Sequence, residues 1–311
     1  MMLRTRTFLR TMSSFKGGVD SQGYSFPTTT DITTSPFYKL ASGRTRPILP
    51  SFENSAEESI YRKEHLAAVF RVLGKHGHGE GIAGHCSVRD AVKPDCFWVN
   101  PWTKSFSRMK ASDLVLVNHA GEVVEGDSAV DASATSLHSA LHEANPSLIG
   151  IVHVHGPYSK AFSALGRQLD MINQDSCVFH NSHVLVPFGG LIQGRDEGVR
   201  ISKLLGGESE GLKKIAVLEN HGALAFGQSS IDEAAWWFLN FEMCCRAQLL
   251  FDSAVGRNQT GKIPEESRVK IIGGTEREFT KLEMGSPEMG WLNFSPYYED
   301  LEWETKGDFK N

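Results

Sequence analysis

The sequence predicts one α/β domain built from three layers. Between residues 55 and 255, apolar runs of strand length alternate with stretches that repeat apolar residues at helical spacing. Strands that alternate with helices along a chain pack as a sheet covered by helices on both faces. The chain has 311 residues, of which 40% are hydrophobic and 22% are charged, so it can bury a sizeable core.

The first 50 residues differ in composition from the rest and are expected to form a disordered or targeting arm. Residues 1–19 contain no acidic residue and four basic ones: Arg4, Arg6, Arg10 and Lys16. This composition suits a mitochondrial presequence, and a disordered basic tail equally well. Residues 20–50 are rich in Pro, Ser and Thr and cannot build a core, so the folded domain is expected to begin near residue 55.

The first helix of the domain is expected over residues 55–73. Ser55 and Glu58 stand three residues apart, which is the spacing of a capping box at a helix start. Apolar residues then recur at helical spacing at Ile60, Leu66, Val69, Phe70 and Leu73. Gly74 and Gly77 are expected to end this helix.

The segments that follow predict further strands and helices in alternation. Strands are expected at 86–90, 96–101, 113–118, 122–126, 147–155 and 183–190, and a strand pair at 214–227. Helices are expected at 133–146, 156–166, 197–207 and 232–255. The tail from 256 to 311 is polar until an aromatic segment, GWLNFSPYYEDLEW, which is expected to pack on the domain or on a neighbouring subunit.

Charge, cysteine usage and hydropathy exclude several classes of protein. The net charge of -5 provides no basic surface of the kind that binds nucleic acid. The five cysteines form no CxxC pair and indicate reduced thiols, so a cytoplasmic location is expected, with mitochondria as the alternative that the basic N-terminus raises. Every apolar run is shorter than the roughly 20 residues of a membrane span.

Three histidines at strand ends form the candidate metal site. His153 and His155 close the apolar run IVHVH, and because side chains alternate along a strand, both rings point to one face. His221 ends a similar run and precedes a glycine, as His155 does. Three imidazoles with an open fourth position are typical of a catalytic metal site, although the spacing alone also suits three ordinary strand-end histidines.

Other histidines and aromatics compete for a functional role. His138 and His142 stand four apart on a predicted helix, where they could chelate a metal ion, but a solvated or capping role is the favoured interpretation. The segment HGHGEGIAGH could hold an anion at its backbone amides or form a mobile loop. Aromatic residues near Trp236 are expected to serve as core or subunit contact.

The order of these motifs resembles the class II aldolase/adducin family over roughly residues 60–255. The matching segments are GEGIAGHCSVRD, HSALHEANPSLIGIVHVHGPYSKAFS, VPFGG and VLENHGALAFG. The resemblance implies a three-layer αβα sandwich with a central, mostly antiparallel sheet, assembled as a homotetramer with active sites between subunits. It also implies His153, His155 and His221 as ligands of one divalent ion, normally Zn(II), with Fe(II) or Mn(II) as alternatives.

The sequence departs from the family's sugar-phosphate aldolases at positions that carry their chemistry. Their catalytic Glu lies 19 residues before the first metal histidine, where this chain has Ala134 preceded by Ser133. Gly84-His85 and Trp102-Thr103 replace residues that hold the substrate phosphate in those enzymes. Gly84, His85, Trp102, Thr103 and Ser133 are therefore the candidate substrate-binding residues, and the substrate is expected to lack a phosphate.

The resulting functional prediction is a metal-dependent carbon-carbon lyase, an aldolase or decarboxylase, acting on an unphosphorylated oxo- or hydroxy-acid. A metal ion with three neutral ligands keeps its full charge and suits an anionic substrate. His138, Gln174 and Asp175 are the candidates to replace the missing acid/base, the last two from the neighbouring subunit.

The alternative prediction is an adducin-like interaction protein of the actin and spectrin cytoskeleton without catalytic activity. Ala134 favours that alternative, because it cannot transfer a proton. The intact histidine set and the lack of a lysine-rich C-terminal segment favour the enzyme.

Overall fold

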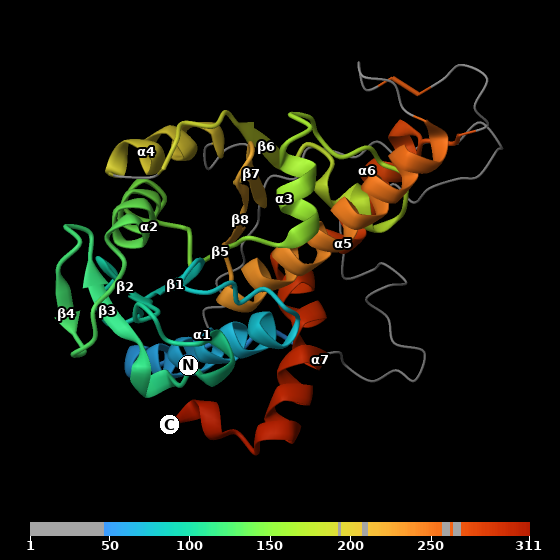
Figure 1. Ribbon diagram of the computed structural model, residues 1–311. Coiled ribbons are helices and arrows are strands. Elements are labelled where there is room, and N and C mark those ends of the chain that lie inside the picture. The colour runs from blue at the N-terminus through green and yellow to red at the C-terminus, as the bar shows by residue number, and fades with distance from the viewer. Residues whose placement is uncertain (1–46, 192–193, 207–210, 257–261, 264–268) are drawn as a thin grey trace.

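The computed structural model describes residues 47–311 except 192–193, 207–210, 257–261 and 264–268 (Figure 1). The arm predicted over residues 1–50 therefore lies almost entirely outside the described residues. The described chain forms one sheet with helices on both of its faces (Figure 1).

The sheet has eight strands in the order β4-β3-β2-β1-β5-β8-β7-β6. All neighbouring strands are antiparallel except β6 and β7, which are parallel. The prediction of a three-layer α/β fold with a mostly antiparallel sheet is thus confirmed. The strands are β1 His85–Arg89, β2 Cys96–Val99, β3 Val115–Asn118, β4 Val123–Glu125, β5 Gly150–Val154, β6 His183–Val186, β7 Ile215–Leu218 and β8 Gly222–Gly227.

Helices cover the two faces unequally. The larger core packs the sheet against α1, α3, α5 and α7, whereas a smaller core lies between the other face and the pair α2 and α4 (Figure 1). Alternate residues of β5 feed these two cores, with Val152 in the larger and Ile151 in the smaller. The helices are α1 Ser55–Lys75, α2 Ala132–Ala144, α3 Pro157–Ser163, α4 Arg195–Leu204, α5 Ile231–Val255, α6 Gly274–Met284 and α7 Pro287–Thr305.

The start of α1 differs from the predicted capping box. Asn54 is the N-cap, and its side-chain oxygen accepts a hydrogen bond from the Ala56 N–H at 2.9 Å. Ser55 is already the first helical residue, so the prediction of Ser55 as the cap was wrong by one position. Either residue type is a favourable N-cap, and the sequence pattern could not choose between two adjacent candidates.

The aromatic segment near the C-terminus lies in α7, which packs against α1 and α5 of the same chain (Figure 1). Phe294 is fully buried in the larger core. Tyr298 stacks on His65 of α1 with ring centroids 4.3 Å apart, and Trp291 donates a hydrogen bond to the Tyr61 hydroxyl at 3.1 Å. A helix of this tail thereby covers a face of α1 and α5.

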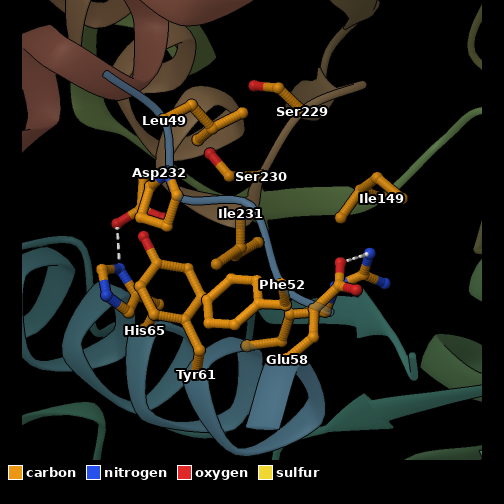
Figure 2. Close-up of a pocket in the computed structure, with 12 residues that line it drawn as sticks. Leu49, Phe52, Glu58, Tyr61, His65, Ile149, Ser229, Ser230, Ile231 and Asp232 are labelled. Carbon is orange, nitrogen blue, oxygen red and sulfur yellow. Dashed lines mark hydrogen bonds and ion pairs between the residues drawn. The ribbon is translucent and has the colours of Figure 1, made fainter. Parts of the chain in front are cut away.

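A small cavity lies between the segment Leu49–Phe52, α1 and the start of α5 (Figure 2). His65 Nδ1 and Asp232 Oδ1 lie 2.6 Å apart at its edge, beside Tyr61 (Figure 2). The cavity measures about 30 Å³, which is the share of a single water molecule and far below the volume of an organic substrate. This pair is consequently a structural link between α1 and α5.

None of the helices in the described ranges is long and apolar enough to cross a membrane.

Arg89 joins β1 to the C-terminal end of α2. Its guanidinium is buried and donates hydrogen bonds to four backbone carbonyls, those of Pro94, His142, Asn145 and Leu148, at 2.6–3.0 Å. A cation at the C-terminus of a helix is also favourable for the helix dipole. Arg89 therefore holds α2 against the strand that carries His85.

We expect Arg89→Met to lower the free energy of unfolding by about 3 kcal/mol or more, because it leaves buried carbonyls without donors. Urea denaturation of the purified variant measures this loss. The exposed Arg108→Met is the matched control and should change stability by less than about 0.5 kcal/mol. Equal effects of the two substitutions would contradict the structural role of Arg89.

Candidate metal centre

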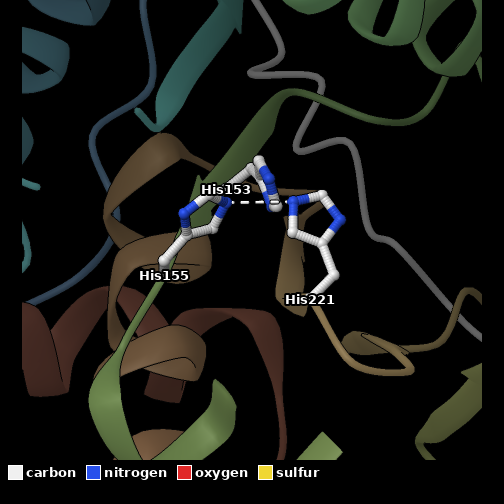
Figure 3. A group of neighbouring side chains, drawn as sticks. All are labelled: His153, His155 and His221. Carbon is white, nitrogen blue, oxygen red and sulfur yellow. Dashed lines mark hydrogen bonds between the residues drawn. The ribbon is translucent and has the colours of Figure 1, made fainter. Parts of the chain in front are cut away.

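Three histidine rings converge at one edge of the sheet (Figure 3). One ring nitrogen from each of His153, His155 and His221 lies within 4.8 Å of the others. His155 Nε2 and His221 Nε2 are 3.0 Å apart. The structure brings together the three residues that the sequence predicted as a group.

Strand alternation and register place this group. His153 is the penultimate residue of β5 and His155 follows its last residue, so the two rings share a face, while Val154 packs in the larger core on the other side. His153 pairs with His85 of β1 in the antiparallel register. Gly84 precedes that pair with φ +89°, and a Cβ there would lie 3.3 Å from the His153 carbonyl oxygen.

His221 reaches the other two rings through a tight turn between β7 and β8. The His221 N–H donates to the Leu218 carbonyl at 3.0 Å, and Asn220 takes the left-handed conformation with φ +56°. Asn is among the residues that adopt this conformation most readily. Gly222 follows with φ +153°, and a Cβ there would contact the His155 ring at 3.6 Å. The sequence NHG thus fits both the turn and the close approach of the rings.

The Nδ1 atoms of His153 and His155 have partners outside the triad, whereas His155 Nε2 is hydrogen-bonded within it, to His221 Nε2 at 3.0 Å. His153 Nδ1 lies 3.0 Å from the Ala223 carbonyl oxygen, which can only accept, so the ring proton sits on Nδ1. His155 Nδ1 lies 3.4 Å from the Glu80 carboxylate, which also pairs with Lys160 at 2.9 Å. Carbonyl and carboxylate partners of this kind orient histidine ligands in metal sites. The donor set therefore fits a divalent ion.

Burial keeps the three imidazoles neutral near pH 7. Desolvation and the neighbouring His155 lower the pKa of His221 to about 4. Desolvation, followed by the nearby His85, holds the pKa of His153 well below its usual range. The pKa of His155 is also lowered by burial, and Glu80 opposes that shift. Neutral imidazole is the form that coordinates a metal ion.

Glu242 of α5 anchors the segment that follows His155. Its carboxylate accepts hydrogen bonds from the Tyr158 N–H at 2.7 Å and the Ser159 N–H at 2.8 Å. A Cβ on Gly156 would lie 2.3 Å from Glu242 Oε2, so a larger residue there would displace this carboxylate from its partners. The motif HxHG is thus held from the opposite side of the sheet by a buried carboxylate that the sequence analysis missed.

His138 and His142 are fully buried between α2 and the sheet, so the favoured interpretation of a solvated or capping role was wrong. Ser87 Oγ of β1 lies 2.5 Å from His138 Nδ1 and 2.9 Å from His142 Nε2. His138 Nε2 lies 2.7 Å from His85 Nδ1, and the His85 ring is 4.8 Å from that of His153. One ring, that of His85, therefore separates His138 from the triad.

Position 134 lies on the same face of α2 as His138, one turn closer to the N-terminus. Ala134 is buried and has no group that could transfer a proton. Asp131 caps α2, and its carboxylate accepts hydrogen bonds from both the N–H and the hydroxyl of Ser133. Trp102 is 45% exposed, and Thr103 follows it with φ +70°.

Gln174 and Asp175 lie at the other end of the sheet from the triad within one chain. They are exposed and begin the short 3-10 helix Asp175–Phe179, which leads into the start of β6. Because β6 runs parallel to β7 and His221 follows the end of β7, the two groups sit at opposite strand ends. Their catalytic role remains a prediction that requires a second subunit.

A comparison with protein families agrees with the fold. The model of the family described as class II aldolase and adducin N-terminal domain matches residues 64–249. The chain belongs to this family.

Several relatives are similar to the chain in sequence. Decarboxylase NovR from Streptomyces niveus is 36% identical over 80% of this chain and 87% of that protein. A 4-hydroxy-3-prenylphenylpyruvate oxygenase/4-hydroxy-3-prenylbenzoate synthase from Streptomyces roseochromogenus is 34% identical over 80% of this chain and 85% of its own length. Beta-adducin from Homo sapiens is 29% identical over 72% of this chain, and the aligned part spans 31% of the length of beta-adducin.

Among solved structures, an L-fuculose 1-phosphate aldolase from Glaciozyma antarctica PI12 superimposes with a TM-score of 0.72. It is 32% identical and covers 86% of this chain and 97% of its own. Together these relatives support a lyase-type enzyme.

We expect Glu242→Ala to destabilise the protein by about 2–4 kcal/mol, because two backbone N–H groups lose a charged acceptor. The displaced β5–α3 junction should also weaken zinc binding, which isothermal calorimetry measures. Glu242→Gln keeps one acceptor oxygen and should lose less of both. Unchanged stability and zinc affinity in Glu242→Ala would refute this role.

The metal-free protein is expected to lose stability steeply as the pH falls below about 6.5. Burial depresses the pKa of His85, His138, His142 and His153 in the folded state below the unfolded value of about 6.5. The unfolded chain then binds more protons, so each residue removes up to about 1.4 kcal/mol of stability per pH unit.

Urea midpoints of EDTA-treated protein at pH 7.5, 6.5 and 5.5 measure this slope. His142→Gln should flatten it, whereas the exposed His76→Gln should change it far less. A midpoint that stays constant from pH 7.5 to 5.5 would be incompatible with neutral buried imidazoles.

Proposed function

We propose that this chain is a divalent-metal-dependent lyase that decarboxylates an unphosphorylated oxo- or hydroxy-acid. The observation that carries the proposal is the convergence of three neutral imidazoles in a chain where Ala134 stands in place of the aldolase carboxylate. Such a site keeps the full positive charge of its ion for an anionic substrate. The relative named as a decarboxylase supports the reaction class.

His153, His155 and His221 would hold the ion, with Zn(II) as the expected metal and Fe(II) or Mn(II) as alternatives. A divalent ion held there would supply a Lewis acid that polarises a carbonyl group of the substrate. Where that carbonyl lies beta to the carboxyl group, it can accept the electron pair of the bond that breaks. Carbon dioxide leaves, and a proton from solvent takes its place on the remaining carbon. The relative named as an oxygenase is the reason to test iron and oxygen as well.

The chain's own residues favour an acid over a sugar phosphate. The Ser133 hydroxyl is engaged with Asp131, the N-cap of α2. The resemblance to the aldolases matches the exposed Trp102 with a residue that holds their substrate phosphate. His85 lies beside His153, where its ring can reach a carboxylate bound to the ion. We further propose a homotetramer in which Gln174 and Asp175 of one subunit approach the triad of the next.

An adducin-like scaffold is the second candidate, because Ala134 removes the aldolase acid/base and beta-adducin is among the relatives. Actin and spectrin would then be the partners. The hydrogen bonds that orient His153 and His155 for coordination favour the enzyme, since a scaffold would not need them.

The test is an activity screen of zinc-, manganese- and iron-loaded protein on 2-oxo and 3-hydroxy acids, with carbon dioxide release as the readout. We expect decarboxylation that falls at least about 100-fold in a His153→Ala, His221→Ala variant. L-Fuculose 1-phosphate should be a poor substrate, and Ala134→Glu alone should not change that.

Efficient cleavage of the sugar phosphate by the unmodified chain would show that the phosphate pocket has been misjudged. Absence of activity on every acid, together with co-sedimentation with actin or spectrin, would favour the scaffold.

A further inference from the structure

A row of buried polar side chains leads from the triad into the layer between the sheet and α2. It connects His142, Ser87, His138 and His85 through contacts of 2.9, 2.5 and 2.7 Å. The first three are completely buried, and His85 is 9% exposed. We call these four residues the His142–His85 row. Burying an imidazole costs free energy unless its nitrogens are hydrogen-bonded, so the burial of three imidazoles in one row indicates a function.

The contacts in this row fix the direction of its hydrogen bonds. A neutral imidazole has one N–H donor and one acceptor nitrogen, and a hydroxyl donates one proton. Each link holds only one proton, and the buried Ser87 hydroxyl contacts only these two rings among the described residues, so it must donate to one ring and accept from the other. All donors therefore point the same way along the row. Either every ring is protonated on the nitrogen nearer the triad, or every ring is protonated on the nitrogen farther from it.

The far end of the row selects between these two directions. His142 Nδ1 is buried and has no hydrogen-bond partner among the described residues. The Leu148 carbonyl, which raises the pKa of His142, already accepts a hydrogen bond from Arg89 Nε at 3.0 Å. In folded proteins, a buried N–H donor without an acceptor is rarer than a buried acceptor atom without a donor. The Arg89 cation near this ring also favours a lone pair at that end.

We propose that the His142–His85 row holds His85 in the tautomer with its proton on Nε2, and that His85 thereby donates a hydrogen bond to the carboxylate of the substrate. His142 Nε2 donates to Ser87, Ser87 to His138 Nδ1, and His138 Nε2 to His85 Nδ1. Ser87 and His138 are positioning residues, and only His85 touches the substrate. The inference rests on the proposed acid substrate.

The location of His85 supports this role. It stands opposite His153 in the register of β1 and β5, with ring centroids 4.8 Å apart, a spacing like those within the triad of 4.8–5.1 Å. Its Nδ1 is occupied by His138, and within the described ranges no hydrogen bond reaches its Nε2. A donor at this place could bind the substrate carboxylate even though Ala134 provides no group for proton transfer.

The tautomers can be read directly from the side-chain ¹⁵N NMR spectrum of the full chain loaded with zinc. We expect His85, His138 and His142 as neutral rings protonated on Nε2. Protonation of His85 on Nδ1 would overturn the proposal, whether or not the protein has lyase activity.

Binding of oxalate, a dicarboxylate probe, tests the donor role by calorimetry. His85→Phe should weaken oxalate binding at least about tenfold, which is the contribution of a hydrogen bond to a charged group. Ser87→Ala should weaken it roughly threefold and give mixed tautomers at His85, whereas Ser87→Thr should restore both. Zinc content should stay at the wild-type value in all variants.

Ser139→Ala is the matched control, because Ser139 is an equally buried serine of α2 outside the row. It should leave oxalate affinity and the tautomers unchanged. Equal oxalate affinity of wild type and Ser87→Ala, or no oxalate binding by wild type, would overturn the donor role. Intact tautomers and oxalate binding without decarboxylation would refute the proposed reaction alone.

Discussion

The register of the three central strands β1, β5 and β8 is the constraint on which the rest of the structure depends. It sets His85 opposite His153 and leaves Leu224 of β8 on the other side of His153. A slip by one residue would turn His153 into the larger core and Val154 towards the triad. Gly84 and Gly222 allow the backbones and rings to approach at this edge, and the β7–β8 turn brings His221 to the same point.

The polar face created by this register needs partners, and α2 supplies them. His138 and His142 lie one turn apart and contact Ser87 together, while Arg89 of the same strand holds the end of α2 through backbone carbonyls. The layer that in most folds would be apolar is therefore a hydrogen-bonded row that ends beside the triad. Its neutrality and fixed donor direction suit recognition of an anion.

The layers of the fold could be predicted from periodicity, and the grouping of His153, His155 and His221 from strand alternation together with the family resemblance. In IVHVH, strand alternation places both histidine rings on one face. The segment NHG, which follows a second strand, indicates where the third ring lies. The burial of His138 and His142 could not be predicted, since their partner Ser87 is an ordinary residue of a short strand. The parallel pairing of β6 with β7 could not be predicted either. The choice between Asn54 and Ser55 as cap depends on a shift of one residue that no pattern resolves.

Metal binding by the triad is the central claim, and X-ray absorption at the zinc edge tests it most directly. Protein loaded with zinc and freed of excess ion should retain one zinc per chain. The spectrum should show imidazole scattering from three nitrogens at about 2.0–2.1 Å. His221→Ala should remove one of these ligands. Failure to retain zinc, or a ligand shell without imidazole that His221→Ala leaves unchanged, would contradict the account.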